Sequence, residues 1–213
     1  MNTVLLTSMP SAAFQLVYYV QTRGFKFNDV VLVGKKSPEF HIFEEYSLIN
    51  KFALHYVSGE NAPDCIDLMK ILQPDVIKAV TCTIIRKPLI EIPVLGILNT
   101  HAAMLPKYRG IDTPQWAILE DGEVGVVEHF LDEKIDTGDI LAIRRLTLKK
   151  GDSISTVLYR NHYENKWQTA ADALIALRDG IAQRHPQRKE DGRQYFEMHT
   201  KLLEIVQEKL NQL

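Results

Sequence analysis

Short apolar runs alternate with longer amphipathic segments in the first half of the chain, and this alternation constrains the fold more than any other feature. Strands are expected at the apolar runs Val4–Thr7, Asp29–Val33, Ala53–Val57, Asp75–Val80 and Ile92–Leu98. Helices are expected between them, at Pro10–Arg23, Pro38–Lys51 and from the N-cap Asn61 to Leu72. Strands that alternate with helices connect by right-handed crossovers and form a mainly parallel sheet covered on both faces. The sequence therefore predicts an α/β, doubly wound fold.

The pattern changes after residue 101, where two extended runs are joined by a polar turn. We expect, in order, a helix at Pro114–Leu119 capped by Asp112 or Thr113, antiparallel strands at Val124–Leu131 and Asp139–Leu148, a long helix from Asp152 or Ser153 to Arg178, a polar loop at His185–Gly192 and an amphipathic helix at His199–Leu213. This order predicts a main domain at residues 1–180, with an antiparallel ribbon, and a helical C-terminal extension at residues 181–213 packed on or beside it.

Composition excludes several classes of protein. The chain has 213 residues, 46% hydrophobic and 24% charged, with a formal net charge of -2, which gives no global footprint for nucleic acid or a membrane surface. Cys65 and Cys82 lack metal-like spacing, so reduced structural thiols are favoured and no metal site is expected. The start lacks the basic and long apolar regions of a secretion signal, and no run could span a bilayer, so a cytoplasmic location is expected.

Motifs for phosphates and metals are also missing. The first strand is followed by Thr7-Ser-Met-Pro-Ser-Ala-Ala-Phe14, without the glycines that let a backbone approach a pyrophosphate. Neither a Walker loop nor a His-Glu-x-x-His motif occurs. The wound sheet alone is therefore no reason to expect a nicotinamide enzyme.

Asn99-Thr-His101 directly follows the fifth expected strand. Residues at the carboxyl end of such a strand point into the crevice where open α/β sheets bind ligands, and positions two apart share one face of extended chain. An amide and an imidazole held there can polarise a carbonyl and move a proton. A second polar cluster, Asp136-Thr-Gly138, lies between the two antiparallel runs. The pair suggests acyl-group chemistry.

Each of these residues also has a structural interpretation. A lone histidine after a strand is more often packed or capping than catalytic, Asn99 can be a turn residue, and Asp136-Thr-Gly138 can be a strand-connecting turn. Their joint occurrence in this order favours the catalytic interpretation.

The pattern Asn99-x-His101-x-x-x-Leu105-Pro106-x-Tyr108-Arg109-Gly110, followed by Asp136-Thr-Gly138, resembles the formyltransferases that use N10-formyltetrahydrofolate. The resemblance is strongest over about residues 92–141. It implies a Rossmann-like formyltransferase fold, with residues 1–180 as its catalytic domain, and a catalytic trio of Asn99, His101 and Asp136. Asn99 would donate to the developing oxyanion, a protonated His101 would stabilise the same oxygen, and Asp136 would raise the pKa of His101 and relay the amine's proton.

The resemblance also implies binding residues. Thr83, Ile84 and Ile85 correspond by position to the segment that cradles the pteridine, with Leu131, Asp132 and Ile135 as the opposite lip, although Ile84 and Ile85 can equally be core. The loop that includes Tyr108, Arg109 and Gly110 is expected to be mainly architectural, with substrate contact from Arg109 as a further role, and Trp116 to line an acceptor cleft or pack in the core.

The acceptor amine is chosen by elimination within the family. Pro10 removes an N–H from the turn that would hold the phosphate of glycinamide ribonucleotide, and about sixty helical residues after the second ribbon strand offer no β-rich domain for tRNA. A small amine, most plausibly that of a nucleotide-linked amino sugar, is therefore expected as the partner of the folate donor. The alternatives are a formyltetrahydrofolate hydrolase, a formyltransferase that acts on glycinamide ribonucleotide or methionyl-tRNA, and a noncatalytic folate-binding protein. The terminal helix and the ribbon could form a homodimer surface.

Overall fold

The computed structural model describes residues 1–35, 38 and 40–213, and the chain divides into two compact units, Met1–Asn99 and Thr100–Leu213. The strands are β1 (Thr3–Thr7), β2 (Asp29–Val33), β3 (Ala53–Val57), β4 (Val76–Val80), β5 (Gly96–His101), β6 (Tyr108–Gly110), β7 (Val124–Phe130), β8 (Ile140–Leu146) and β9 (Arg193–Tyr195). The helices are α1 (Pro10–Thr22), α2 (Phe40–Asn50), α3 (Pro63–Leu72), α4 (Lys87–Ile90), α5 (Thr113–Leu119), α6 (Ile154–Arg160), α7 (Trp167–Arg178) and α8 (Thr200–Asn211). The seven-stranded sheet has the order β3-β2-β1-β4-β5-β7-β8.

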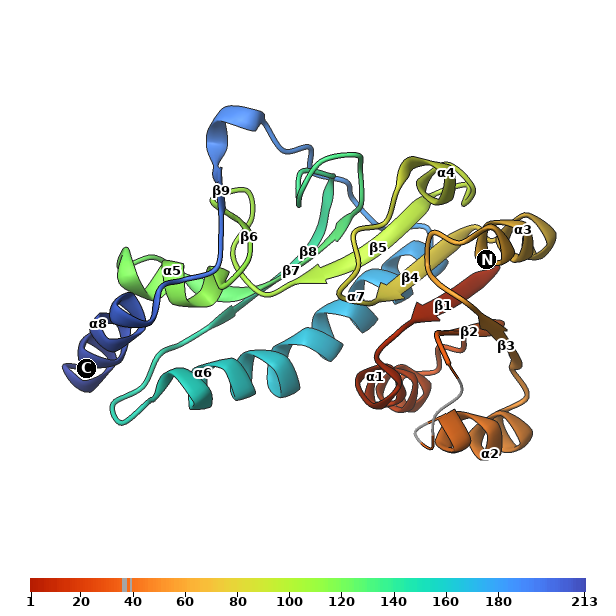
Figure 1. Cartoon of the computed structure of the whole chain (residues 1–213), viewed down its shortest axis with the longest axis horizontal. Helices are drawn as coiled ribbons and strands as arrows, with labels where there is room; N and C mark the ends of the chain where they lie inside the picture. Colours follow the sequence, from red (N-terminus) through yellow and green to blue (C-terminus); the bar gives the residue numbers. More distant parts are fainter. Residues whose placement is uncertain (36–37, 39) are drawn as a thin grey trace. The chain divides into compact units, whose positions relative to one another are not determined.

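The first unit is a parallel sheet with helices on both faces. Each neighbouring pair in the order β3-β2-β1-β4-β5 runs parallel, and β1 and β4 are buried along their whole length. Figure 1 shows α1 and α2 on one side of these strands and α3 and α4 on the other. The predicted α/β, doubly wound class is confirmed. Residue 39, within the expected helix 38–51, lies outside the described residues.

Strand β5 corrects one prediction. It begins at Gly96 and ends at His101, so Ile92–Leu95 is not strand and Asn99 and His101 belong to the strand itself. The segment before it turns because Pro93 has no N–H to donate, and the N–H groups of Val94 and Leu95 bond to the loop carbonyls of Pro74 and Asp75. Asn99 and His101 therefore share one face of a regular strand.

Helix caps differ from expectation at two sites. The N-cap of α3 is Ala62. The side chain of Asn61 instead donates to the carbonyl of Ile84 and accepts from the N–H of Arg86. The N-cap of α5 is Asp112, in a left-handed conformation and without a side-chain capping bond. Ser153 does cap α6, in a reciprocal pair with Thr156.

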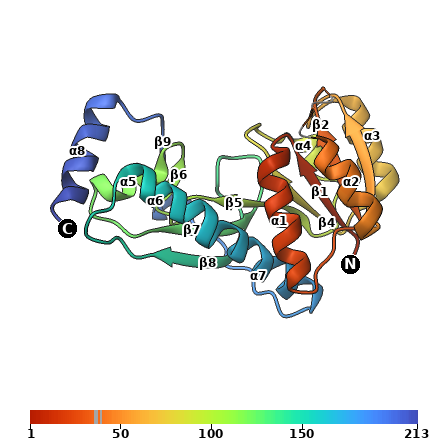
Figure 2. The same ribbon diagram turned by 90° about the horizontal axis from the view of Figure 1, so that it is seen from below.

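The second unit contains the predicted antiparallel pair β7–β8, with a register irregularity between Glu128 and His129. The expected long helix is α6, a π-helical turn at Asn161–Lys166 and α7, which continue one another in Figure 2. Asn161 gives its side-chain amide to the carbonyls of Ala102 and Gly125, so the π-turn is tied to the strand ends by hydrogen bonds.

The residues after 180 are built into the second unit rather than trailing from it. β9 pairs in parallel with β6 as a small separate sheet, which the sequence did not predict. The apolar stripe of α8 enters the core of this unit through Val206 and Leu210, and α8 lies beside α5. The expected loop 185–192 holds only a short 3₁₀ turn, Lys189–Asp191. Among the described residues, no helix is long and apolar enough to cross a membrane.

Candidate functional site

The segment that joins β7 to β8 carries Asp136 in a strained backbone conformation. Its φ is 52°, in the left-handed region that residues with a Cβ avoid. Gly138 closes the turn where no side chain fits, because a Cβ there would lie 2.0 Å from the carbonyl oxygen of Phe130. The predicted connecting turn is thus also the segment that carries the predicted catalytic carboxylate. A residue in this conformation persists only where its surroundings hold it.

Two histidines and one backbone amide surround the Asp136 carboxylate. Oδ2 accepts a hydrogen bond from the N–H of Gly110 at 2.9 Å and lies 3.4 Å from Nδ1 of His101. Oδ1 lies 3.5 Å from Nε2 of His129. The side chains of His101, His129 and Asp136 are 7%, 0% and 13% exposed. We call these three residues the imidazole–carboxylate cluster.

His129 is the member of the cluster that sequence reasoning missed. It stands inside an apolar run, where a histidine is usually a packing residue, and only the irregular register at Glu128 and His129 reveals its role. Such irregularities re-aim side chains next to functional sites. Here Glu128 accepts from the hydroxyl of Thr100, while the neighbouring His129 faces Asp136. In the sequence His129 is only a polar residue within a buried strand, which does not by itself indicate a functional role.

The backbone decides which nitrogen of each imidazole carries a proton. Nε2 of His101 contacts the carbonyl of Tyr108 at 2.7 Å, and Nδ1 of His129 contacts the carbonyl of Phe130 at 2.8 Å. A carbonyl only accepts, so both of these nitrogens are donors. The other nitrogen of each ring faces the carboxylate, and it donates there only when that ring takes a second proton. The cluster is therefore built to hold and release protons at one carboxylate.

Burial and charge act on the pKa values in opposite directions. Burial lowers the pKa of His101 and outweighs the raising effect of the Asp136 charge, so the expected protonated His101 is corrected to a histidine whose pKa lies below its usual value. Burial would raise the pKa of Asp136, but the hydrogen bond with His129, the charges of both histidines and the Gly110 N–H bring it to about 2. Asp136 is thus a carboxylate near neutral pH, and burial favours the neutral form of His101.

Asn99, the third residue of the predicted trio, ends the first unit. It is half-buried and precedes His101 by two positions on β5, so both side chains belong to one face of the strand. This placement is what the sequence predicted for a donor beside His101. Its role towards an oxyanion stays a prediction.

The predicted substrate residues fall into two groups. Tyr108 is fully buried in the core of the second unit, so only its carbonyl reaches the cluster, through His101. Arg109 is 4% exposed and donates to the side chain of Gln187 and the carbonyl of Arg188. Gly110 supplies its N–H to Asp136. Trp116 donates its ring N–H to the carbonyl of Phe196, so it contributes to packing of the tail. Each of these positions is occupied by contacts within the protein, as the architectural interpretation expects.

The loop after β4, which carries the expected pteridine-binding residues of the first unit, is held by a buried carboxylate. Glu60 is 6% exposed and accepts from the hydroxyl of Thr81 at 2.5 Å. Thr81 in turn accepts from the hydroxyl of Ser8 and the N–H of Thr83. Ile85 is buried, whereas Ile84 is 67% exposed, so of the two isoleucines only Ile84 has an exposed apolar side chain. We call Glu60, Thr81 and Ser8 the hydroxyl–carboxylate cluster.

The expected opposite lip lies in the second unit. Leu131 and Ile135 are half-buried, and Asp132 accepts from the hydroxyl of Thr137 at 2.6 Å and the N–H of Lys134 at 3.0 Å. Asp132 therefore shapes the turn that presents Asp136. Across the described ranges, no group of three or more His, Cys, Asp or Glu residues could hold a metal ion.

Comparison with known proteins identifies relatives of this chain. The family model described as formyl transferase matches residues 10–173. The methionyl-tRNA formyltransferase of Methylacidiphilum infernorum (isolate V4) is 39% identical over 131 residues, 60% of this chain and 40% of that protein. The chain spans less than half the length of the curated relatives it matches first.

Solved structures share the fold. A sugar N-formyltransferase from Shewanella sp FDAARGOS_354 aligns with a TM-score of 0.70 and 17% identity, over 99% of this chain and 88% of that one. A formyltransferase from Anoxybacillus kamchatkensis, in complex with UDP-4,6-dideoxy-4-formamido-L-AltNAc and tetrahydrofolate, aligns with a TM-score of 0.59 and 22% identity, over 78% of this chain and 85% of that one.

Proposed function

The chain belongs to the formyl transferase family, and from this premise we propose that it transfers a formyl group from N10-formyltetrahydrofolate to a primary amine of a small acceptor. The observation that carries the proposal is the imidazole–carboxylate cluster, in which Asp136 is shared by His101 and His129. Acyl transfer to an amine requires one proton to leave the attacking nitrogen and one to reach the departing nitrogen. A buried carboxylate between two imidazoles suits that exchange.

The proposed reaction has two bond changes. The acceptor nitrogen attacks the formyl carbon, which forms a C–N bond and a tetrahedral oxyanion. The side-chain amide of Asn99 would donate to that oxygen, an interaction of a few kcal/mol per donor. The ammonium proton passes to the cluster through Asp136, and the cluster returns a proton to N10 as the old C–N bond breaks. Every atom and proton is conserved, and the products are an N-formyl amine and tetrahydrofolate.

For the donor, we propose that Thr83, Ile84 and Ile85 contact the pteridine, and we propose Leu131, Asp132 and Ile135 as further folate-binding residues. Support comes from the exposed side chain of Ile84 and from the structure of a relative that contains tetrahydrofolate. The catalytic domain is proposed to be residues 1–180, with 181–213 as its extension. Substrate contact by Arg109 or Trp116 is not part of the proposal, because both side chains bond within the protein.

For the acceptor, we propose the amine of a nucleotide-linked amino sugar. The fold of a sugar N-formyltransferase aligns over 99% of this chain, and the formal net charge of -2 offers no footprint for RNA. Methionyl-tRNA is the second candidate, because curated relatives that are 39% and 31% identical to this chain are methionyl-tRNA formyltransferases. A cytoplasmic location and a homodimer stay predictions.

The test is a formylation assay read by mass spectrometry. The protein is incubated with N10-formyltetrahydrofolate and, in separate reactions, with nucleotide-linked amino sugars, glycinamide ribonucleotide, methionyl-tRNA or no amine. A gain of one formyl group on an amino sugar supports the proposal, and His101→Asn should abolish it with the fold retained. Formate release without an amine would indicate a hydrolase. Folate binding without any turnover would indicate a noncatalytic protein and overturn the proposal.

A further inference from the structure

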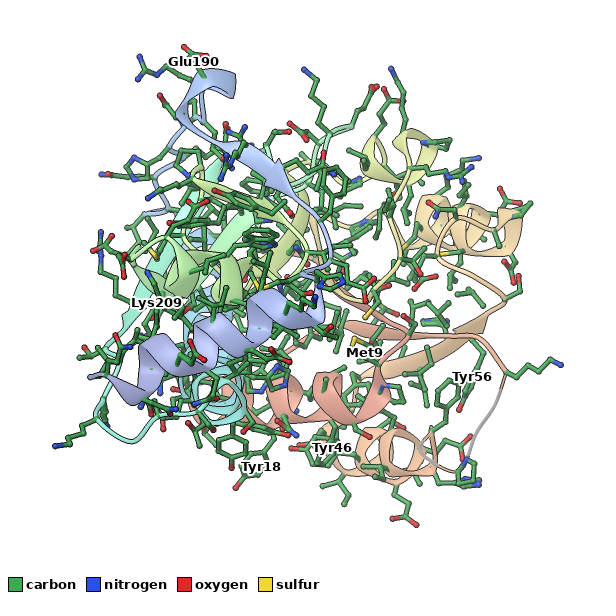
Figure 3. The ribbon with its side chains drawn as sticks, turned by 60° about the vertical axis from the view of Figure 1, so that its left-hand side comes forward. Met9, Tyr18, Tyr46, Tyr56, Glu190 and Lys209 are labelled. Atoms are coloured by element: carbon green, nitrogen blue, oxygen red, sulfur yellow. The ribbon has the colours of Figure 1, made fainter. Side chains whose placement is uncertain are left out.

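The segment after α7 returns along the second unit and contacts both loops that build the imidazole–carboxylate cluster. His185 exchanges two backbone hydrogen bonds with Ile140 at the start of β8, each 2.9 Å long. β9 then pairs with β6, which opposes Tyr195 to Gly110. Between these two anchors lies Gln187. We call residues 185–195 the return segment, and Glu190 marks its outer turn in Figure 3.

Gln187 bonds directly to the backbone of the Asp136 turn. Its Nε2 donates to the carbonyl oxygen of Asp136 at 3.2 Å and to that of Gly138 at 2.7 Å. Both acceptors belong to the turn in which Asp136 has its left-handed conformation. A residue in that conformation persists only where its surroundings hold it. The side-chain amide of Gln187 supplies two hydrogen bonds that hold the turn in this conformation.

Arg109 fixes the orientation of the Gln187 amide. The guanidinium only donates, and it lies 3.2 Å from Oε1 of Gln187 through its terminal nitrogen and 3.4 Å through Nε. The carbonyls of Asp136 and Gly138 only accept, so they take Nε2. With the amide inverted, Nε2 would face the guanidinium donors of Arg109, and Oε1 would face the two carbonyl oxygens. Arg109 is also held by the carbonyl of Arg188, so its own position is fixed by the return segment.

We infer that Gln187 is a positioning residue for the Asp136 carboxylate. It links the loop that supplies the Gly110 N–H with the turn that supplies Asp136, by way of Arg109. Loss of the Nε2 donor frees two carbonyls of a strained turn, and the turn relaxes. The carboxylate then moves away from the Gly110 N–H and from both imidazoles. This inference gives Arg109 a mechanical role in place of substrate contact and rests on the proposed function.

The test uses two variants at one position and one control. Gln187→Met keeps the side-chain length without the amide, and Gln187→Glu keeps the acceptor for Arg109 but lacks the donor. Gln183→Met is the control, because residue 183 is an exposed glutamine that precedes the return segment. For both Gln187 variants we expect kcat for formyl transfer to fall about 10- to 100-fold, the range that displacement of a catalytic group by about 1 Å produces, with KM for the amine unchanged.

A second readout does not depend on activity. The Gly110 N–H donates to the Asp136 carboxylate, and the next amide, Ile111 N–H, donates to the carbonyl of Tyr195 at 3.1 Å. Hydrogen exchange followed by NMR should accelerate at Gly110 in both Gln187 variants, by about tenfold or more, while Ile111 stays protected. Gln183→Met should change neither amide.

The outcomes separate the two hypotheses. Unchanged protection of Gly110 in both Gln187 variants would overturn the positioning role. Equal loss at Gly110 and Ile111 would also overturn it, because the return segment would then have detached as a whole. Selective loss at Gly110 supports the role even if the unmodified protein transfers no formyl group, in which case only the proposed function fails. If Gln187→Met does not fold, the same two amides of Gln187→Glu decide the question.

Discussion

Each of the two units has a largely buried carboxylate in a loop that follows a strand, and the two carboxylates have different partners. Glu60 in the first unit is bonded to hydroxyl groups, and Asp136 in the second unit faces two imidazoles. Burial alone would raise the pKa of both, yet the pKa of each lies below its usual value because hydrogen-bond donors surround the charged form. Low pKa and burial therefore do not distinguish a structural carboxylate from a reactive one.

The partners make the distinction. The hydroxyl of Thr81 donates to Glu60, and the hydroxyl of Ser8 donates to Thr81. Neither hydroxyl gains or loses a proton at physiological pH. Imidazole, in contrast, is the kind of side chain that can exchange a proton near physiological pH. The hydroxyl–carboxylate cluster is therefore a fixed clamp on the loop after β4. The imidazole–carboxylate cluster can pass a proton on.

The largest effect is expected at Asp136. Asp136→Asn removes the proton acceptor at nearly constant volume, and we expect kcat to fall by about 10²- to 10⁴-fold, the usual contribution of a general acid–base group. Single-turnover formyl transfer measures the loss, and circular dichroism checks the fold. A variant that retains more than a tenth of the activity would place the proton transfer elsewhere.

His129 provides the next test. In His129→Asn the side-chain amide can still donate to the carbonyl of Phe130, but nothing replaces the nitrogen that faces Asp136. Since the hydrogen bond with His129 is the foremost influence that lowers the pKa of Asp136, that pKa should rise. We expect kcat to fall about 10-fold, with the acid limb of the pH–rate profile moved to higher pH. An unmoved acid limb would mean that His129 only packs.

The strands of the first unit could be predicted from the sequence in part. The parallel sheet could be predicted because strands buried on both faces are continuous apolar runs, as in Val76–Val80. The start of β5 could not be predicted, because the apolar run extends back to Ile92. Pro93 and the backbone hydrogen bond of Val94 nevertheless prevent strand pairing there. Apolar character measures burial, and hydrogen bonding determines the strand.

The site was predictable only in part, for a related reason. His101 and Asp136 lie next to recognisable breaks in the apolar pattern, so they could be found. His129 and Gln187 reach the same carboxylate or its turn through tertiary contacts that no local pattern encodes. The pKa of His101 was expected to rise beside Asp136 and is lowered instead, because the sequence does not reveal that the ring is 7% exposed.

The pH dependence of stability tests the electrostatics of Asp136. Its pKa in the folded protein, about 2, lies below the usual 3.8, so the folded state gains stability above about pH 4 and loses it as the pH falls towards 2. The gain is about 2 kcal/mol. Urea unfolding at pH 5 and pH 3 should show a smaller loss on acidification for Asp136→Asn than for the unmodified protein. Equal losses would indicate that the carboxylate is not stabilised in the fold.

Glu60→Gln tests the other carboxylate. The substitution keeps the volume and removes the charge that the hydroxyl of Thr81 bonds to, so the free energy of unfolding should fall by about 1–2 kcal/mol. Because the hydroxyl of Thr81, which does not exchange a proton at physiological pH, holds Glu60, kcat should stay within about threefold. Chemical denaturation and steady-state kinetics measure the two quantities. A loss of kcat as large as that of Asp136→Asn would end the distinction between the two clusters.

The smallest effect calibrates the others. Ser153 caps α6 by accepting from the N–H of Thr156, and Ser153→Ala should cost about 1 kcal/mol of unfolding free energy. This helix start contributes no residue to either carboxylate cluster, so kcat should be unchanged at temperatures where the variant is folded. Comparison with Glu60→Gln then separates lost stability from lost chemistry. If Ser153→Ala lowered kcat as much as Glu60→Gln, the effect of Glu60 on turnover would reflect stability alone, and the hydroxyl–carboxylate cluster would have no separate role in holding the loop for a ligand.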